Sequence, residues 1–114
     1  MKAEVINWSK IAKSDVEKGV TRQVYSTKNV MIVKYTYSPN AVYKEHAHPQ
    51  EQITLIEKGE IVFKVGDEEM ILKEDDICFI PPNVLHSAKV LRGRVETINI
   101  FYPVKEEFLN EESS

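Results

Sequence analysis

The stretch "HAHPQEQ" at residues 46–52 places two histidines one residue apart, followed by a proline and three polar side chains. The chain has only three histidines in its 114 residues, and the apolar run "ITLI" follows this stretch directly. Alternate side chains of an extended segment share a face, so His46 and His48 should project together, and Gln52 has the same parity. The stretch therefore predicts a strand boundary that carries side chains able to bind a metal ion.

The third histidine, His86, begins a later strand-like segment just after the turn "PPN" at residues 81–83. A His-x-His pair with another histidine about forty residues further on can place three metal-binding nitrogens on one face of a β-barrel. The alternative is that these imidazoles are surface or hydrogen-bonded core residues without a ligand. The pattern favours a metal site and leaves that alternative open.

Short segments rich in β-branched and aromatic residues dominate the chain from residue 20 onward, and turn residues separate them. This spacing predicts an antiparallel sandwich or small barrel, which we place at residues 20–104 of a single domain spanning 1–114. Residues 1–19 should form an irregular or helical arm, and residues 109–114 a disordered acidic tail. The expected strands are residues 20–25, 29–37, 52–58, 60–65, 69–73, 76–80, 86–91 and 95–102.

The composition is that of a globular chain without a specialised partner surface. Lys+Arg 15 against Asp+Glu 18 gives a net charge of -3, so we expect no nucleic-acid-binding face. No apolar run approaches the length of a membrane span, and Glu4 and Asn7 interrupt the region where a signal peptide would be apolar. The single cysteine, Cys78, cannot form an internal disulfide and is expected to be a buried thiol. These features predict a cytoplasmic protein.

Two spaced patterns in the chain resemble the motifs of the cupin superfamily, G(X)5HXH(X)3,4E(X)6G and G(X)5PXG(X)2H(X)3N. Both spacings hold without a gap, although Gln52 replaces the usual glutamate and Val90 the final asparagine. Residues 40, 75 and 83 are Asn or Asp where the family has glycine, and these two types best tolerate a left-handed backbone. The matching positions are Asn40, His46, His48, Gln52 and Gly59 in the first motif, and Asp75, Pro81, Asn83, His86 and Val90 in the second.

The resemblance implies an all-β fold, the cupin double-stranded β-helix or jelly-roll barrel, with one divalent metal ion at its open end. The ligands would be His46, His48, Gln52 and His86. These neutral ligands would leave the ion its full double charge, which favours Lewis-acid chemistry, and Ni, Zn, Mn, Co or Fe would each suit them. If the strand entered one residue out of register, Glu51 would replace Gln52 as the oxygen ligand.

Within the small single-domain cupins, "HAHPQEQ" is similar to the H-x-H-P-x-E-Q segment of the pectin-degradation protein family. The segments "FIPPNVLHSA" at residues 79–88 and "NIFYPVKEEFL" at residues 99–109 resemble the second motif and the closing segment of that family. Its members open and ketonise the unsaturated monouronate released by pectate or alginate lyases. The resemblance implies a metal-dependent, isomerase-like enzyme of carbohydrate metabolism that acts on a small sugar acid or another small carboxylate.

The closing segment departs from that family at two positions. Asn99 stands where the family has aspartate and Lys105 where it has arginine, while Phe101 matches. We expect these three residues to face the substrate, with Lys105 pairing a carboxylate without the two-pronged geometry of arginine. An amide cannot relay a proton, so the family reaction should be severely slowed or be a different one. Glu45 or Glu51 is a possible substitute base, and the alternative for Asn99 is a satisfied polar residue in the barrel mouth.

Two other functions stay open from the sequence. One is a non-catalytic protein, such as a sensor, that binds a metal and a small acid, and the other is a metal-dependent dioxygenase. The family resemblance further implies a homodimer in which the N-terminal strands add to the sheet of the partner. The tyrosines at positions 25, 35, 37 and 43 are assigned to packing rather than to carbohydrate stacking.

Overall fold

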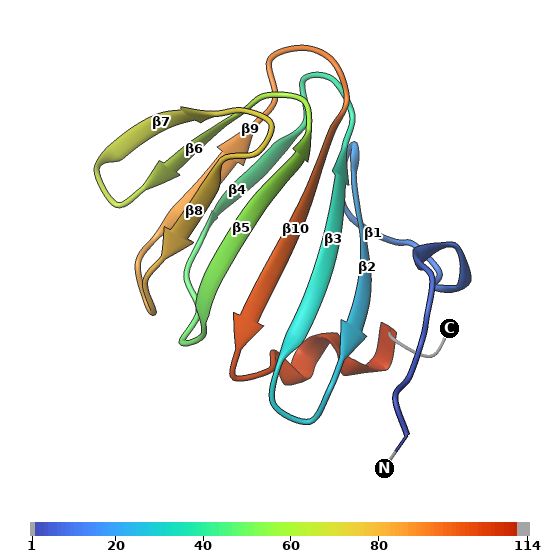
Figure 1. The fold of residues 1–114 in the computed structure, drawn as a ribbon. Coiled ribbons are helices and arrows are strands. Elements are labelled where there is room, and N and C mark those ends of the chain that lie inside the picture. Colours follow the sequence, from blue (N-terminus) through green and yellow to red (C-terminus); the bar gives the residue numbers. More distant parts are fainter. Residues whose placement is uncertain (1, 112–114) are drawn as a thin grey trace.

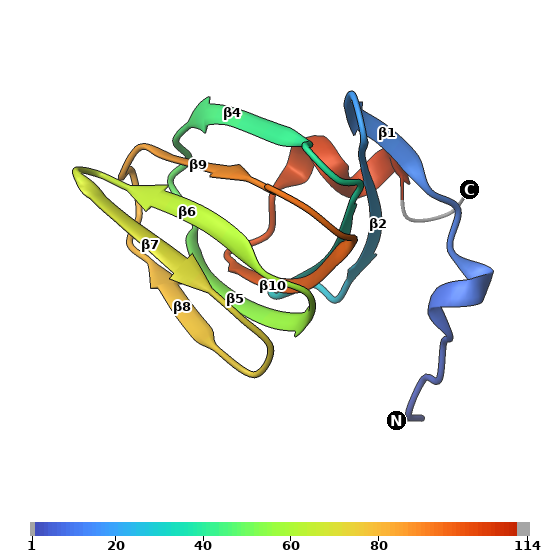
Figure 2. The ribbon, with the colours of Figure 1, turned by 90° about the horizontal axis from the view of Figure 1, so that it is seen from above.

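The chain folds into two β-sheets that lie face to face. A computed structural model describes residues 2–111. Its elements are η1 (Trp8–Lys10), β1 (Ser14–Glu17), β2 (Val20–Ser26), β3 (Met31–Tyr37), β4 (Val42–His46), β5 (Glu51–Lys58), β6 (Ile61–Val65), β7 (Glu68–Leu72), β8 (Ile77–Ile80), β9 (His86–Lys89), β10 (Val95–Tyr102) and η2 (Glu106–Glu111). A six-stranded sheet, in the order β1-β2-β3-β10-β5-β8, faces a four-stranded sheet, β4-β9-β6-β7 (Figure 1). Seen from above, the two sheets enclose a flattened barrel, so the expected all-β jelly roll is confirmed (Figure 2).

The alternation of burial along the strands shows which side chains face the interior of the barrel. Every second residue of β3 and of β10 is buried, and the residues between them are half-buried. The buried apolar residues form one cluster, which includes Val20, Val24, Met31, Val33, Ile56, Ile61, Val95 and Phe101. The predicted thiol is also part of it, since Cys78 is buried and free.

The turns confirm the reading of the residues that replace glycine in the two motifs. Asn40, Asp75 and Asn83 all have a positive φ, at 66°, 73° and 66°. Gly59 also has a positive φ, and a Cβ on it would lie 2.5 Å from the backbone oxygen of Arg94. The two motifs therefore place their left-handed turns where the spacing predicted them, and only at Gly59 does the neighbouring backbone demand glycine itself.

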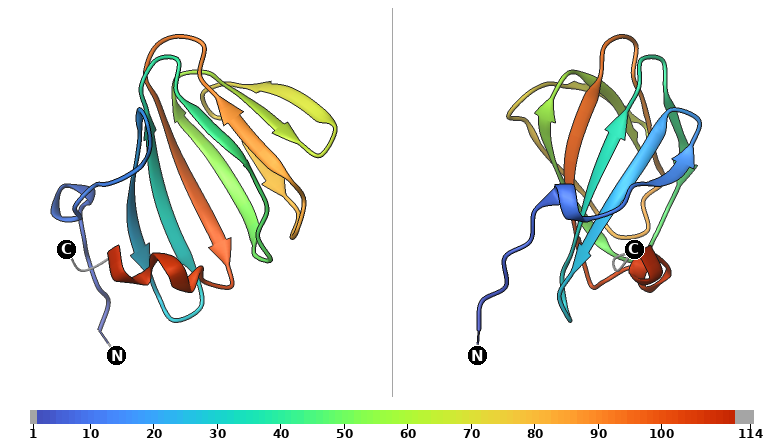
Figure 3. Two further views of the ribbon diagram at one scale, coloured as in Figure 1. Left: turned by 180° about the vertical axis from the view of Figure 1, so that it is seen from behind. Right: turned by 90° about the vertical axis from the view of Figure 1, so that its right-hand side faces the viewer.

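The N-terminal arm is shorter than the sequence suggested, because its last residues form a strand. Ser14–Glu17 form β1, which pairs antiparallel with β2. Gly19, with a φ of 78°, lets the chain turn back between them, and Val16 packs against the core. Ahead of β1, the arm contains the short η1 and lies beside the sheet edge formed by β1 and β2 (Figure 3). The arm is tethered there by the side chain of Gln23, whose Nε2 donates to the backbone oxygens of Trp8 and Ile11 at 2.8 Å and 2.9 Å.

The sequence also missed β4, the strand that ends at His46. This strand is at the edge of the four-stranded sheet and pairs with β9, with His46 opposite His86. None of its residues is buried, so it lacks the apolar alternation by which the other strands were recognised.

The start of the predicted tail is ordered. Residues 109–111 belong to η2, so the expectation of disorder from residue 109 was wrong for them, and residues 112–114 lie outside the described residues. The helix is anchored by Phe108, which is buried beneath the guanidinium of Arg22 at 3.8 Å from the ring centroid. Among the described residues, no helix is long and apolar enough to cross a membrane.

Candidate metal centre

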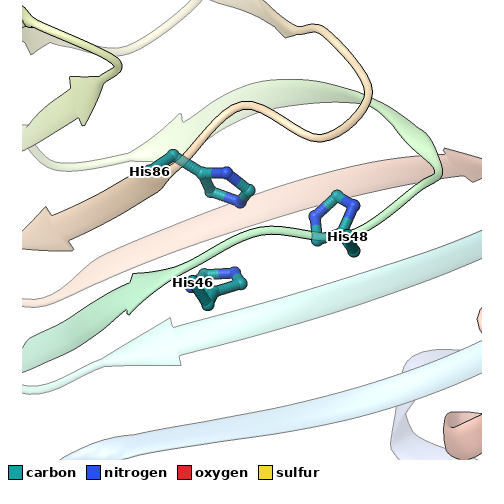
Figure 4. Close-up of side chains that lie close together, drawn as sticks. All are labelled: His46, His48 and His86. Carbon is teal, nitrogen blue, oxygen red and sulfur yellow. The ribbon is translucent and has the colours of Figure 1, made fainter.

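The three histidines converge on one point inside the barrel, at the end where β4 finishes and β9 begins (Figure 4). His46 ends β4, His48 lies in the loop that follows, and His86 begins β9. One ring nitrogen from each lies within 4.8 Å of the other two. His48 and His86 are buried and His46 is partly buried. The sequence pattern therefore predicted correctly that these three side chains meet.

Hydrogen bonds to the backbone fix the tautomer of each imidazole. In all three rings Nδ1 lies next to a backbone carbonyl two residues away, and a carbonyl oxygen can only accept, so Nδ1 carries the hydrogen and donates it. Each neutral ring is then left with a lone pair on Nε2. The carbonyls and distances are Lys44 at 2.9 Å for His46, Gln50 at 3.0 Å for His48 and Val84 at 2.8 Å for His86.

Gln52 brings a fourth electron pair to the same place. Its Oε1 lies 3.0 Å from Nε2 of His48, while its own amide nitrogen donates to the side chains of Thr54 and Asn99. Two acceptor atoms thus face each other in a buried site, and Nε2 of His86 is buried without any hydrogen-bond partner. A cation would bind such lone pairs and remove the cost of burying them without partners, so these residues fit a divalent metal ion.

The alternative ligand, Glu51, is not part of the cluster. Glu51 and Gln52 point to opposite faces of β5, with Glu51 exposed and Gln52 buried. The other carboxylate considered from the sequence, Glu45, is exposed on β4. Among the described residues, no carboxylate joins the three histidines.

Burial keeps the imidazoles neutral. Desolvation lowers the pKa of His46 to about 4, with further lowering from the charges of His86, Lys105 and His48. The pKa values of His48 and His86 are also lowered, mainly by burial and then by nearby positive charge, including that of Lys105. Because a metal ion needs the neutral imidazole, this environment leaves all three rings ready to bind at neutral pH.

Lys105 places a positive charge close enough to this cluster to lower the pKa of all three histidines. Its side chain is buried, with Nζ 4.2 Å from the ring centroid of Phe108 and 5.0 Å from that of Phe101. Burial lowers its own pKa to about 8, which leaves most molecules charged at pH 7. Phe101 in turn meets the ring of His48 edge-on, with the centroids 5.4 Å apart. Phe101 and Lys105 therefore both lie beside the histidine cluster.

Asn99 lies behind Gln52, at the centre of a buried polar network. Its Oδ1 accepts from Gln52 Nε2 at 3.1 Å and from Thr54 Oγ1 at 2.7 Å. Its Nδ2 donates to the backbone oxygen of Val33 at 3.2 Å and to Thr97 Oγ1 at 2.8 Å. All four hydrogen-bonding positions of the amide are thus used by the protein.

Sequence reasoning missed several side chains of the site. Three tyrosines pack in or against the hydrophobic core, as the sequence predicted, but they also line a cavity of about 20 Å³ beside the histidines, together with Gln52, Asn99 and Phe101. One of them, Tyr43, stacks on His46 with the ring centroids 4.7 Å apart. Thr54 was missed too, although its parity with Gln52 along β5 could have indicated it. The tyrosines, at positions 35, 37 and 43, carried no comparable signal, because alternating aromatics are equally typical of core strands.

Comparisons with known proteins agree with this architecture. The family model described as "Cupin domain" matches residues 33–101. An RmlC-like cupin from Shewanella frigidimarina NCIMB 400 is 26% identical with a TM-score of 0.87, covering 95% of this chain and 97% of its own. KdgF from Halomonas sp. is 25% identical with a TM-score of 0.86, covering 96% of this chain and 100% of its own. A predicted oxalate decarboxylase from Thermotoga maritima shares the fold at 18% identity and a TM-score of 0.79, covering 89% of this chain and 100% of its own. No curated protein matches the chain significantly.

Proposed function

The chain belongs to the cupin domain family, and on that premise we propose that it binds one divalent transition metal ion through His46, His48, Gln52 and His86. The observation that carries the proposal is that three imidazole lone pairs and one amide oxygen converge without hydrogens between them. This nitrogen and oxygen set suits Ni, Zn, Mn, Co or Fe. When bound, such an ion would supply Lewis-acid chemistry, polarising a carbonyl or hydroxyl oxygen of a small ligand.

For the ligand we propose a small sugar acid of the unsaturated uronate type, which the protein would open and isomerise. The likeness to KdgF supports this class, since it spans nearly the whole of both chains. Lys105 would pair the carboxylate, because its buried ammonium lies next to the cluster and is mostly charged at pH 7. Phe101 would pack against the apolar face of the sugar ring and hold it beside the histidines.

A second candidate function is binding without turnover. The observation in its favour is that no carboxylate of the described residues joins the histidine cluster, and Glu45 and Glu51 are both exposed. Ring opening and ketonisation move protons between oxygen and carbon, and Asn99 cannot relay one. A protein of this kind would hold the metal and a small acid as a sensor or carrier.

One experiment separates the two candidates. Metal-loaded protein is mixed with the unsaturated monouronate freshly released by a lyase, and the sugar is followed by proton NMR while binding is measured by calorimetry. Conversion faster than the uncatalysed rate supports the enzyme. Heat of binding without conversion supports the sensor, and neither signal from protein with bound metal would exclude this class of ligand.

The variant Lys105→Met tests the proposed carboxylate contact. The substitution keeps the length of the side chain and its packing between the two phenylalanines but removes the charge. We expect the affinity for the sugar acid to fall about tenfold or more, as for loss of a charge-assisted contact, with metal affinity unchanged. Equal affinity of the variant and the parent for the acid would rule out this role for Lys105.

We also propose that the protein forms a homodimer through the outer face of the six-stranded sheet. Cross-strand pairs make this face apolar, and on the edge strand Ile77 and Phe79 are 71% and 54% exposed. An apolar sheet face suits another sheet face rather than a small ligand, and a second copy would supply one. The N-terminal arm, which lies beside the edge of this sheet, has Val5 97% exposed and would contact the partner (Figure 3). The paired residues of the face are Ile53 with Phe79 and Ile100, and Leu55 with Ile77 and Ile98.

A further inference from the structure

A line of amide groups connects the backbone of β3 with the histidine cluster. It runs from the carbonyl of Val33 to the side chain of Asn99, then to Gln52, and ends at Nε2 of His48. We propose that Asn99 is a positioning residue that decides which end of the Gln52 amide faces the histidines. The proposal rests on the metal site proposed above and deepens it by naming what makes Gln52 a ligand.

The question arises because a glutamine side chain has two ends of nearly equal size and opposite character. The oxygen carries lone pairs, whereas the nitrogen carries two hydrogens and offers nothing to a cation. In the opposite orientation Gln52 would point hydrogens into the cluster and donate to the lone pair of His48. Glutamate, the usual residue in the cupin motif, presents an oxygen whichever way it turns, so glutamine needs an additional device to fix its orientation.

The orientation of Asn99 is set by a backbone carbonyl group, which can accept a hydrogen bond but never donate one. The backbone oxygen of Val33 only accepts, so the Asn99 atom 3.2 Å from it must be the amide nitrogen. The same nitrogen lies 2.8 Å from the hydroxyl of Thr97, which accepts its second hydrogen. The side-chain oxygen of Asn99 is therefore directed the other way, toward Gln52.

Thr54 makes the orientation of Gln52 doubly determined. Its hydroxyl lies 2.7 Å from Oδ1 of Asn99 and must donate its single hydrogen there. The hydroxyl can then only accept from Gln52 Nε2, which lies 2.9 Å away, while Asn99 accepts from the same nitrogen at 3.1 Å. Both hydrogens of Gln52 are used by acceptors, and a reversed amide would place its oxygen against two oxygens. Oε1 must therefore face His48.

This arrangement gives Asn99 a role that differs from contact with the substrate. All its donors and acceptors are engaged by Val33, Thr97, Thr54 and Gln52, so the amide has none left for a ligand. Its contribution reaches the site through Gln52 instead. An aspartate at position 99 would still accept a hydrogen bond from Gln52. To bond the Val33 carbonyl, however, its carboxyl group would have to be protonated, whereas the amide of asparagine donates this hydrogen bond at any pH.

The test measures metal affinity rather than turnover. Cobalt(II) or zinc(II) is titrated into metal-free protein, with affinity from calorimetry and coordination from the cobalt absorption spectrum. Asn99→Leu keeps the volume but removes the acceptor, and we expect affinity to fall by about tenfold to a hundredfold, as for other residues that orient a metal ligand. Asn99→Asp retains the acceptor, so its metal affinity should stay within a few-fold of that of the parent.

Two controls separate positioning from general damage. Gln23→Leu removes another buried amide from the same sheet, one that holds the arm through Trp8 and Ile11 and should leave metal affinity unchanged. In a Gln52→Leu background, Asn99→Leu should cause no further loss, because the ligand that it orients is already absent. If Asn99→Leu does not fold, Thr54→Val removes the second acceptor and should lower affinity in the same Gln52-dependent way.

The outcomes that would overturn the proposal are distinct from failure of the metal site itself. Unchanged affinity in Asn99→Leu, or an equal loss with and without Gln52, would show that Asn99 does not act through Gln52. A parent protein that binds neither cobalt nor zinc, with folding intact, would instead reject the metal site on which the proposal rests.

Discussion

The inner and outer faces of β5 and β10 reverse the usual distribution of polarity. Facing the barrel interior, these two central strands bury Gln52, Thr54, Thr97 and Asn99. Facing outward, the residues between them include four aliphatic side chains that are only half-buried, at positions 53, 55, 98 and 100. A strand with one solvated face ordinarily places its apolar residues inside and its polar residues outside. Both departures on the same two strands therefore call for a reason.

The reason for the inner face is the histidine cluster. Buried polar groups destabilise a fold unless each is hydrogen-bonded. Here the four side chains bond one another and the Val33 carbonyl, and only Oε1 of Gln52 is left for the histidine cluster. The same inner rows are apolar at Ile56 and Val95, which belong to the hydrophobic core. The polarity is thus confined to the part of the barrel that orients Gln52.

For the outer face, the reason that we propose is contact with a second copy of the chain. Apolar rows exposed to water favour association, and a second copy of the chain offers an identical face. Substitutions on the two sides of β5 and β10 should therefore have different consequences: those on the inner face should affect the metal site, and those on the outer face should affect the assembly state.

Loss of one imidazole should have the largest effect. We expect His86→Ala to lower metal affinity at least about a hundredfold, because it removes a ligand and not only a group that orients one. Calorimetry with zinc or cobalt measures the change. Lys89→Ala, an exposed position on the same strand, is the matched control and should bind as the parent does. Similar metal affinity in His86→Ala would contradict the metal centre.

A charge on the outer face should change the assembly state and leave the site intact. Phe79→Lys should convert the proposed dimer to monomers at micromolar concentration, since a lysine would be buried against an apolar partner surface. Sedimentation equilibrium gives the mass, and metal titration shows whether the site survives. A parent protein that is already monomeric would reject the outer-face contact.

Neighbouring substitutions on β10 compare the two faces directly. Thr97→Val removes the acceptor of an Asn99 hydrogen bond, and leaving that donor unpaired should lower the free energy of unfolding by about 1–3 kcal/mol. Ile98→Thr, on the outer face of the same strand, should change it by less, about 1 kcal/mol in a monomeric background. Urea denaturation of both variants measures the difference, and the reverse order would contradict the proposed division between the faces.

Acidification should produce the smallest effect, on the metal-free protein. Burial lowers the pKa of His46 from 6.5 to about 4, so between these values the unfolded chain binds a proton that the folded chain does not. The stabilisation is complete above pH 6.5 and is lost as the pH falls through about 4. Because the side chain is partly exposed, we expect this residue to contribute about 1 kcal/mol. Thermal melts from pH 7 to pH 4.5 should show the fall in Tm, and His46→Asn should make it shallower.

The spacing of particular residues was enough to predict the barrel and the three histidines that meet inside it. The informative features are two histidines of equal parity, a third about forty residues later, and Asn or Asp at the three left-handed turns. Each reflects a local backbone rule that can be recognised from neighbouring residues in the sequence. The same rules failed for β4 and β1, because none of their residues is buried and the strands carry no apolar period. The ordered start of the tail was missed because Phe108 is stabilised by Arg22, which is distant in sequence.

The sequence by itself determined that three histidines could bind a metal and that His46 and His48 would share a face, since both depend on residue type and on a period of two. Only the tertiary structure decided that Gln52 and not Glu51 faces the cluster, and that Asn99 is fully engaged behind it. Those outcomes depend on hydrogen bonds between β3, β5 and β10, which are brought together by the sheet and not by their order along the chain. A hydrogen bond also depends on the direction of its donor, and no count of residues specifies that direction.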